Sequence, residues 1–290
     1  MTTSHRYDIV DVFAPQPYAG NPLAVVHGGE TLTDAAMQAV AREFNLSETV
    51  FPLPPTVPDA DYRVRIFTPS VELPYAGHPS IGAAWLLAHR GVIGHGKVRQ
   101  QCAAGIIPVQ VDRDGARVAG GRPEAGADLD AATLAGVVGL TVADVDRTGA
   151  PGVAAAGAPF AFLQVHDEAV AGARPDTGAI IGRTAGMIGL VLFSFDRGSR
   201  RAHVRMFAPG SGVTEDPGGG ASAVALGVHL VHRGLLPPDG RSSFVISQGA
   251  ELGRQSVLDV EVRAEAGRAV QTSVRGAVVA VARGELVRLP

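Results

Sequence analysis

The chain has 290 residues, with 25 Lys and Arg against 28 Asp and Glu and a formal net charge of −3. This balance leaves no basic footprint for nucleic acid, and no apolar run of about 18 residues predicts a membrane span. Near the amino terminus there is no apolar segment typical of a signal peptide, and the one cysteine, Cys102, cannot form an internal disulfide. We therefore expect a soluble cytoplasmic protein without a nucleic-acid or membrane partner.

Short runs rich in Val and Ile recur along the chain and end at Gly, Pro, Asp or Ser. Together with 37 glycines and 20 prolines, they are typical of strands joined by tight turns. These runs predict an α+β fold with many strands. The runs cover residues 62–67, 106–111, 190–195, 244–247, 257–262 and 277–281.

The first candidate site residue follows the first predicted helix. That helix begins after Thr33, a suitable N-cap, and Asn45 can end it. Glu48 then enters an apolar strand, Thr49-Val50-Phe51. A carboxylate there would be half-buried, and desolvation would raise its pKa into the range useful for general acid/base catalysis. An ordinary strand-edge glutamate is the alternative, because most glutamates are exposed.

An internal repeat organises the chain. Its longest copies read GHPSIGAAWLLAHRG and GASAVALGVHLVHRG. Each has the apolar spacing of a helix that buries one face, and each ends at a glycine suited to a left-handed C′ position. Pairs of similar segments occur in the same order in the two halves of the chain. They therefore predict two pseudo-symmetric lobes facing each other across a cleft. The matching ranges are 20–26 with 157–163, 65–69 with 205–209, and 77–91 with 220–234.

Both repeated helices open at glycine-rich turns, Gly77-His78-Pro79 and Pro217 to Gly220. A helix start offers unpaired N–H groups and positive dipole charge, which bind carboxylates, although the glycines also suit a plain turn. His78 is a candidate hydrogen-bonding or proton-shuttling group, with helix capping as its alternative. Asp216 is a second candidate, with turn formation as its alternative. No metal-ligand spacing or cofactor motif occurs, so we expect side chains alone to perform any chemistry.

Five segments in order resemble the PhzF-like proteins of phenazine biosynthesis, over nearly the whole chain. The resemblance implies a diaminopimelate-epimerase-like α+β architecture, in which two lobes each wrap a curved sheet around a central helix. It places the active site in the cleft between a lobe of residues 1–118, completed by 278–290, and a lobe of 119–277. It also implies a homodimer. The segments are GNPLAVV at 20–26, SETVF at 47–51, RIFTPSVELPYAGHPSIGAA at 65–84, RMFAPGSGVTEDP at 205–217 and QGAELGR at 248–254.

The resemblance also implies a function. It makes Glu48 the general acid/base and His78 and Asp216 its catalytic partners, in an isomerase without metal or organic cofactor. PhzF itself isomerises trans-2,3-dihydro-3-hydroxyanthranilate, so a small carboxylate-bearing substrate of secondary metabolism is expected, either amino-acid-derived or a cyclic diene. The substrate-binding residues that the resemblance implies are Asn21, Ser47, Gly77, Pro79, Gly219, Gly220, Ala221 and Ser222.

One motif departs from the family pattern. Where the family has EDPATGSA, residues 215–222 read EDPGGGAS, so Gly219 replaces a threonine and Ala221 a serine. This predicts altered contacts with substrate hydroxyl groups and leaves a differently specific or non-catalytic binding protein as an alternative. A two-base epimerase is a further alternative. Its relatives carry a thiol at each helix start, however, and Cys102 lies elsewhere.

Overall fold

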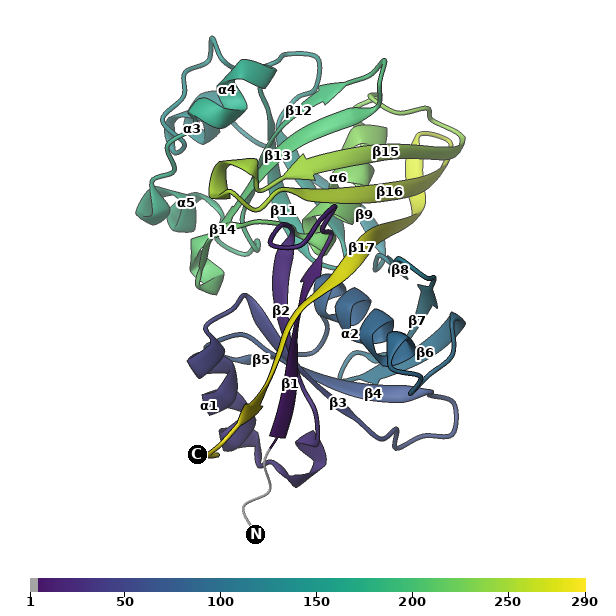
Figure 1. Ribbon diagram of the computed structural model, residues 1–290. Coiled ribbons are helices and arrows are strands. Elements are labelled where there is room, and N and C mark those ends of the chain that lie inside the picture. Colours follow the sequence, from purple (N-terminus) through teal and green to yellow (C-terminus); the bar gives the residue numbers. More distant parts are fainter. Residues whose placement is uncertain (1–4) are drawn as a thin grey trace. The chain divides into compact units, whose positions relative to one another are not determined.

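The computed structural model describes residues 5–290, and the chain divides into two compact units (Figure 1). Of the described residues, 5–118 and 275–290 form the first unit, and 119–274 form the second. Each is mixed α+β, as the strand and helix patterns predict. Within residues 5–290, no helix has both the length and the apolar character needed to cross a membrane.

The first unit contains two α-helices, and its last strand, β17, begins in the second unit. Its elements are β1 His5–Val12, β2 Asn21–Val26, the 3₁₀ turn η1 Gly29–Thr31, α1 Asp34–Phe44, β3 Glu48–Leu53, β4 Tyr62–Phe67, β5 Glu72–Leu73, α2 Gly77–His89, β6 Gly96–Cys102, β7 Gly105–Val111, β8 Gly115–Ala119 and β17 Arg268–Leu286.

The second unit repeats this arrangement with more short helices. Its elements are β9 Pro123–Asp128, α3 Ala131–Gly136, β10 Gly152–Ala156, β11 Pro159–Gln164, α4 Asp167–Gly172, α5 Thr177–Arg183, β12 Leu190–Asp196, β13 Arg201–Ala208, η2 Pro209–Ser211, β14 Val213–Asp216, α6 Gly220–His232, β15 Gly240–Gln248, η3 Ala250–Leu252 and β16 Ser256–Glu265.

Strand pairing confirms the internal repeat. In the first unit β1 and β2 are antiparallel, β2 and β3 parallel, β3 and β4 antiparallel, β4 and β6 parallel, and β6 and β7 antiparallel. In the second unit β10, β11, β12, β13, β15 and β16 follow the same sequence of directions. Each parallel pair needs a crossover, and a helix-containing segment supplies it. The two predicted pseudo-symmetric lobes are therefore present.

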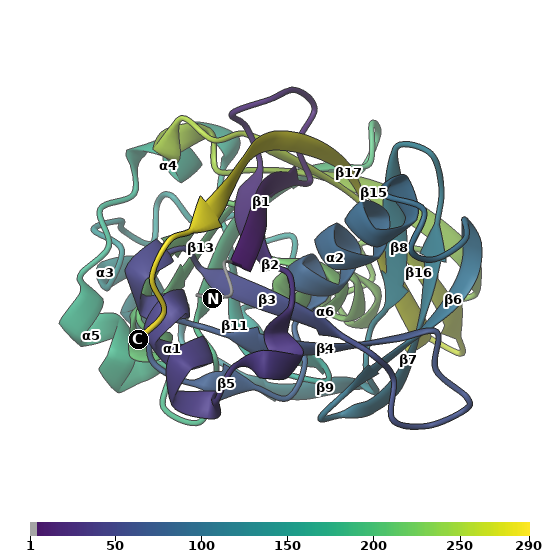
Figure 2. The same ribbon diagram turned by 60° about the horizontal axis from the view of Figure 1, so that its bottom comes forward.

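The central helices are enclosed far more than their sequence pattern predicts. The apolar stripe indicates one buried face, but every residue of α2 from Gly77 to Ala88 is buried. Helix α2 contacts β1, β2, β3 and β7 (Figure 2). Helix α6 contacts β9, β10, β11 and β16. One-face burial was therefore wrong, because strands approach each helix from several sides. Small residues allow this close approach.

Local signals at the helix ends act as predicted. The Thr33 side chain accepts a hydrogen bond from the Ala36 N–H at 3.2 Å and so caps α1, and Asn45 ends that helix with φ of 50°. Gly91 and Gly234 follow α2 and α6 with φ of 71° and 65°, a left-handed conformation that glycine adopts without strain.

Gly227 of α6 provides a test of this close packing. A Cβ atom there would lie 2.6 Å from Val262 Cγ2, so Gly227→Ala should lower the free energy of unfolding by about 1–3 kcal/mol. Gly182, in α5 of the same unit, has no atom within 4 Å of such a Cβ. Gly182→Ala should therefore be neutral or stabilising by up to about 1 kcal/mol. Urea unfolding of both variants measures the contrast, and equal effects would contradict the enclosed position of α6.

Candidate functional site

Glu48 stands at the first position of β3, where the parallel pairing with β2 begins opposite Leu23. The strand continues into a buried apolar run, and the Glu48 side chain is 17% exposed. The carboxylate therefore lies at the junction between an apolar interior and the surface of the unit.

His78 is the second residue of α2 and lies against Glu48. Its Nδ1 is 3.2 Å from Glu48 Oε2, and only 5% of its side chain is exposed. Burial lowers the pKa of His78 to about 3, although a hydrogen bond to the Pro22 backbone opposes this in part. At neutral pH the imidazole is therefore uncharged, and Glu48 contacts a neutral partner rather than an imidazolium.

The other predicted residues of the first unit border this pair in the chain. Asn21 starts β2 and is fully buried, and Ser47 directly precedes β3. Gly77 and Pro79 lie in the first turn of α2, whose N-cap residue Ala76 supplies no capping side chain. The first N–H groups of α2 are consequently left without a side-chain cap.

A buried polar chain holds the start of α2 in place. The Tyr62 hydroxyl donates to Gln100 Oε1 at 3.1 Å, and Gln100 Nε2 donates to Ser80 Oγ at 2.8 Å. Ser80 Oγ in turn donates to the Ala76 carbonyl oxygen at 2.8 Å. This chain of hydrogen bonds links β4 and β6 to the turn that carries His78, and no sequence motif predicts it.

Asp216 occupies the corresponding turn of the second unit. The Gly218 N–H donates to Asp216 Oδ1 at 2.9 Å, and Gln248 Nε2 donates to the Asp216 backbone oxygen at 2.6 Å. Desolvation raises the pKa of Asp216 to about 6, against a smaller opposing effect of the Gly218 hydrogen bond. The carboxyl group can therefore exchange a proton near neutral pH.

The glycine at position 219 makes room for the side chain of Ser222, the serine that stands one position later than in the family pattern. A Cβ atom on Gly219 would lie 2.5 Å from Ser222 Oγ and 3.2 Å from Asp216 Oδ2. Ser222 is buried, and its hydroxyl donates to the Gly219 carbonyl oxygen at 2.9 Å. The missing side chain at position 219 thus leaves the space that this hydroxyl uses. Gly220 begins α6, and Ala221 after it is exposed.

The repeated scaffold carries different chemistry in its two copies. Aligning Gly20 with Gly157 makes Ala24 equivalent to Ala161, and these pair with Thr49 and Leu190. The counterpart of Glu48 is therefore Gly189. A Cβ atom at Gly189 would lie 2.1 Å from the Phe207 carbonyl oxygen, so no side chain fits there. By the same alignment of the central helices, Ala221 is the counterpart of His78 and Leu73 that of Asp216.

Cys102 is the last residue of β6 and is not part of either central helix. Its thiol approaches the Gly105 carbonyl oxygen at 3.6 Å, and burial raises its pKa. Both features disfavour a reactive thiolate. Within residues 5–290, no group of three or more His, Cys, Asp or Glu side chains is placed to hold a metal ion.

Sequence comparison assigns relatives over almost the full length. A family model described as phenazine biosynthesis-like protein (PhzC-PhzF) matches residues 10–284. An uncharacterised isomerase of Mesorhizobium japonicum is 35% identical and covers 98% of this chain and 99% of its own. The trans-2,3-dihydro-3-hydroxyanthranilate isomerase of Pseudomonas aeruginosa is 33% identical, with coverage of 97% and 100%.

Structure comparison supports the same architecture. The phenazine biosynthesis protein of the PhzF family from Bacillus anthracis superposes with a TM-score of 0.89. The match covers 99% of this chain and 100% of that one at 22% sequence identity, and so establishes the fold.

The neutral state of His78 can be measured directly. NMR of the ¹⁵N-labelled ring should show one protonated and one bare nitrogen from pH 8 down to pH 5, because burial keeps the pKa of His78 near 3. His78→Gln identifies the signal by its loss. Titration of the His78 ring with a midpoint between pH 6 and 7 would contradict the neutral contact with Glu48.

Proposed function

This chain belongs to the phenazine biosynthesis-like (PhzC-PhzF) family, and from that membership we propose a proton-shifting reaction at Glu48. The protein is an isomerase, as its named relatives are. In our proposal, Glu48 moves one proton between two carbon atoms of a small carboxylate-bearing metabolite. The substrate is amino-acid-derived or a cyclic diene, and no cofactor takes part.

The contact between Glu48 and neutral His78 carries this proposal. A protonated His78 at 3.2 Å would form an ion pair with the Glu48 carboxylate, whereas the neutral imidazole forms none and leaves this carboxyl group to the substrate. The helix starts carry Gly77-His78 and Gly220-Ala221 in place of two thiols, which supports one base rather than two, because the two-base relatives place a thiol at each helix start.

The reaction then has two steps that share one carboxyl group. Glu48 removes a proton from an sp³ carbon next to a conjugated system, so a C–H bond breaks and an O–H bond forms. The electron pair delocalises over the conjugated system. The protonated Glu48 delivers its proton, which has exchanged in part with solvent, to another carbon on the same face, and a double bond has shifted. No electron donor or acceptor is needed.

The remaining predicted residues bind and orient the substrate in this proposal. The uncapped first turn of α2 offers the N–H groups of Gly77 and His78 to a carboxylate, with Pro79 fixing the backbone there, and the start of α6 with Gly220 and Ala221 offers the same kind of donor. Asp216, with a pKa raised to about 6, can donate a hydrogen bond in its protonated form and accept one when ionised. Asn21 and Ser47 flank Glu48.

The rearranged turn at Gly219 supports a substrate different from that of the Pseudomonas relatives. Ser222 directs its hydroxyl to the Gly219 carbonyl, so it is not offered as a donor where the family's serine would stand, one position earlier. We propose that this enzyme takes a metabolite with fewer or differently placed hydroxyl groups. The homodimer stays a prediction from the family resemblance, and the cytoplasmic location stays a prediction from the sequence.

Substitution of the base tests the proposal. The wild type and Glu48→Gln are incubated in D₂O with trans-2,3-dihydro-3-hydroxyanthranilate and with a panel of small unsaturated amino and hydroxy acids. Mass spectrometry should detect deuterium at carbon and isomerised product for the wild type. Glu48→Gln should lose at least about 10³-fold in rate, since no other group carries the proton. Calorimetry should show that the variant still binds the substrate.

Three outcomes distinguish the alternatives. Exchange retained in Glu48→Gln would refute the role of Glu48. Binding without exchange in the wild type would indicate a binding protein that has lost catalysis. Cys102→Ala should keep full activity, because its buried thiol has a raised pKa, and a loss of activity would reopen the two-base mechanism.

A further inference from the structure

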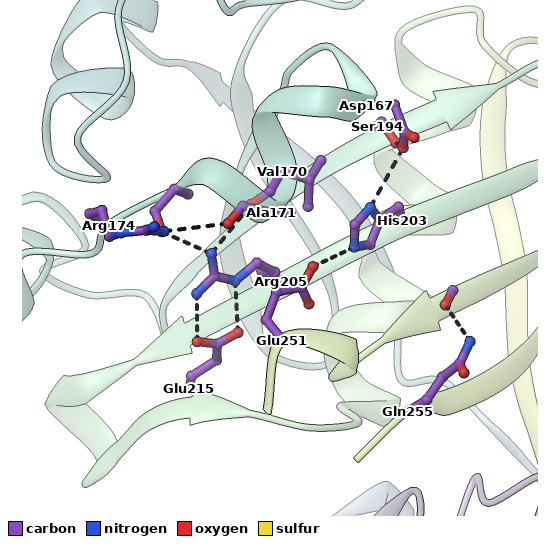
Figure 3. A network of polar contacts seen from close by, with 12 residues as sticks. Asp167, Val170, Ala171, Arg174, Ser194, His203, Arg205, Glu215, Glu251 and Gln255 are labelled. Carbon is purple, nitrogen blue, oxygen red and sulfur yellow. Dashed lines mark hydrogen bonds and ion pairs between the residues drawn. The ribbon is translucent and has the colours of Figure 1, made fainter. Parts of the chain in front are cut away.

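Arg205 of β13 makes an unusually complete set of contacts for a buried arginine (Figure 3). Its Nε and Nη2 donate to the two carboxylate oxygens of Glu215, each at 2.8 Å. Its Nη1 donates to the Ala173 and Val170 carbonyl oxygens, at 2.9 and 3.3 Å, around the end of α4. Arg205 is 6% exposed. One guanidinium therefore joins β13, β14 and the end of α4.

Such a pair is not explained by stability alone. Desolvating two charges costs about as much as their attraction returns, and apolar residues of similar volume often serve stability equally well. What the pair does supply is geometry, because the planar guanidinium fixes a carboxylate in a bidentate arrangement. The residue fixed in this way is Glu215, the direct neighbour of Asp216 on β14.

A second buried side chain, that of Gln248, also binds the turn that carries Asp216. Gln248, 1% exposed, donates from Nε2 to the Asp216 backbone oxygen at 2.6 Å. Its Oε1 accepts from the Gly219 N–H at 3.5 Å. The segment from Glu215 to Gly219 is thus bound at both ends by buried side chains from neighbouring strands, with the Asp216 carboxyl group between them.

The first unit contains an equivalent ion pair. Arg65 of β4 donates to both carboxylate oxygens of Glu72 at 2.7 and 2.6 Å, and its guanidinium lies 5.1 Å from the Phe67 ring centre. Arg205 lies 5.1 Å from the Phe207 ring centre in the same way. Both pairs therefore occur at matching places in the repeat, between the strand and the short hairpin that leads to the central helix.

We propose that Arg205 is a positioning residue, which acts through Glu215 to hold the Asp216 carboxyl group in its half-buried place at the start of α6. The inference rests on the proposed function only in treating Asp216 as a residue of the active site. Arg205 does not need to touch the substrate.

The protonation of Asp216 reports this positioning. Burial raises its pKa to about 6, and the opposing effect comes from the Gly218 N–H. The charge of Arg205 is balanced by Glu215 at hydrogen-bonding distance. A looser turn would admit water and let the Asp216 pKa fall toward its ordinary value of about 4.

Arg205→Lys keeps the positive charge but loses the planar bidentate geometry. The Asp216 pKa is measured by isotope-edited infrared spectroscopy of ¹³C-labelled aspartate, with Asp216→Asn identifying the band. We expect a midpoint displaced by at least one pH unit toward acid. On a substrate that turns over, kcat should fall roughly tenfold to hundredfold with a smaller change in KM, because the group is misplaced rather than absent.

Arg233→Lys is the matched control. Arg233 is also mostly buried and also donates to a carboxylate, Asp128, at 2.6 Å. It follows the last residue of α6, about 20 Å along the helix from its start. This variant should leave the Asp216 midpoint unchanged, although it belongs to the same unit.

Arg205→Met/Glu215→Gln provides a second variant if Arg205→Lys does not fold. It removes both charges together, which is often neutral for stability, and it should displace the Asp216 midpoint in the same direction. An unchanged midpoint in a folded Arg205 variant, or an equal displacement in Arg233→Lys, would overturn the proposal. The titration midpoint of Asp216 is measured without substrate. Its result is therefore independent of the deuterium-exchange experiment on Glu48.

Discussion

The parallel pairing of β2 with β3 determines the position of Glu48, the proton carrier in our proposal. It starts opposite Leu23 and sets Glu48 at the edge of the buried strand. The same unit encloses α2, so that His78, the second residue of that helix, reaches Glu48 at 3.2 Å from a buried position. Enclosure also explains the neutral imidazole, because desolvation penalises its charged form. Strand pairing and helix enclosure within this unit therefore determine both the distance between Glu48 and His78 and the uncharged state of His78.

The repeat shows how one scaffold can support an asymmetric reaction. Both units use the same strand directions, the same enclosed helix and the same arginine–glutamate pair. The functional groups differ, since Glu48 corresponds to Gly189 and Asp216 to Leu73. The shared parts provide the framework and the differing parts the chemistry. This division agrees with a single proton carrier in one unit and a titratable orienting group in the other.

Features that depend on a few neighbouring residues could be predicted from the sequence. Features that depend on contacts between distant residues could not. The Thr33 cap, the Asn45 terminus and the glycines after α2 and α6 depend on one turn of backbone each, and all were predicted. The repeat also revealed the two-lobed α+β fold. The apolar stripe of α2 indicated only one buried face, because burial on its other sides depends on strands from distant parts of the chain, and it was the family resemblance that implied a sheet wrapped around this helix. Gln248, Gln100 and the Arg205–Glu215 pair were missed for the same reason.

The central claim is that one carboxyl group carries one proton from carbon to carbon. Its most direct test is a single-turnover reaction in H₂O with substrate deuterated at the carbon that loses its proton. A single carrier on one face should deliver a measurable part of that deuterium to the accepting carbon of the product, because the same group returns what it removed. Complete absence of transferred deuterium, with product formed at the normal rate and only solvent hydrogen at the accepting carbon, would contradict the account.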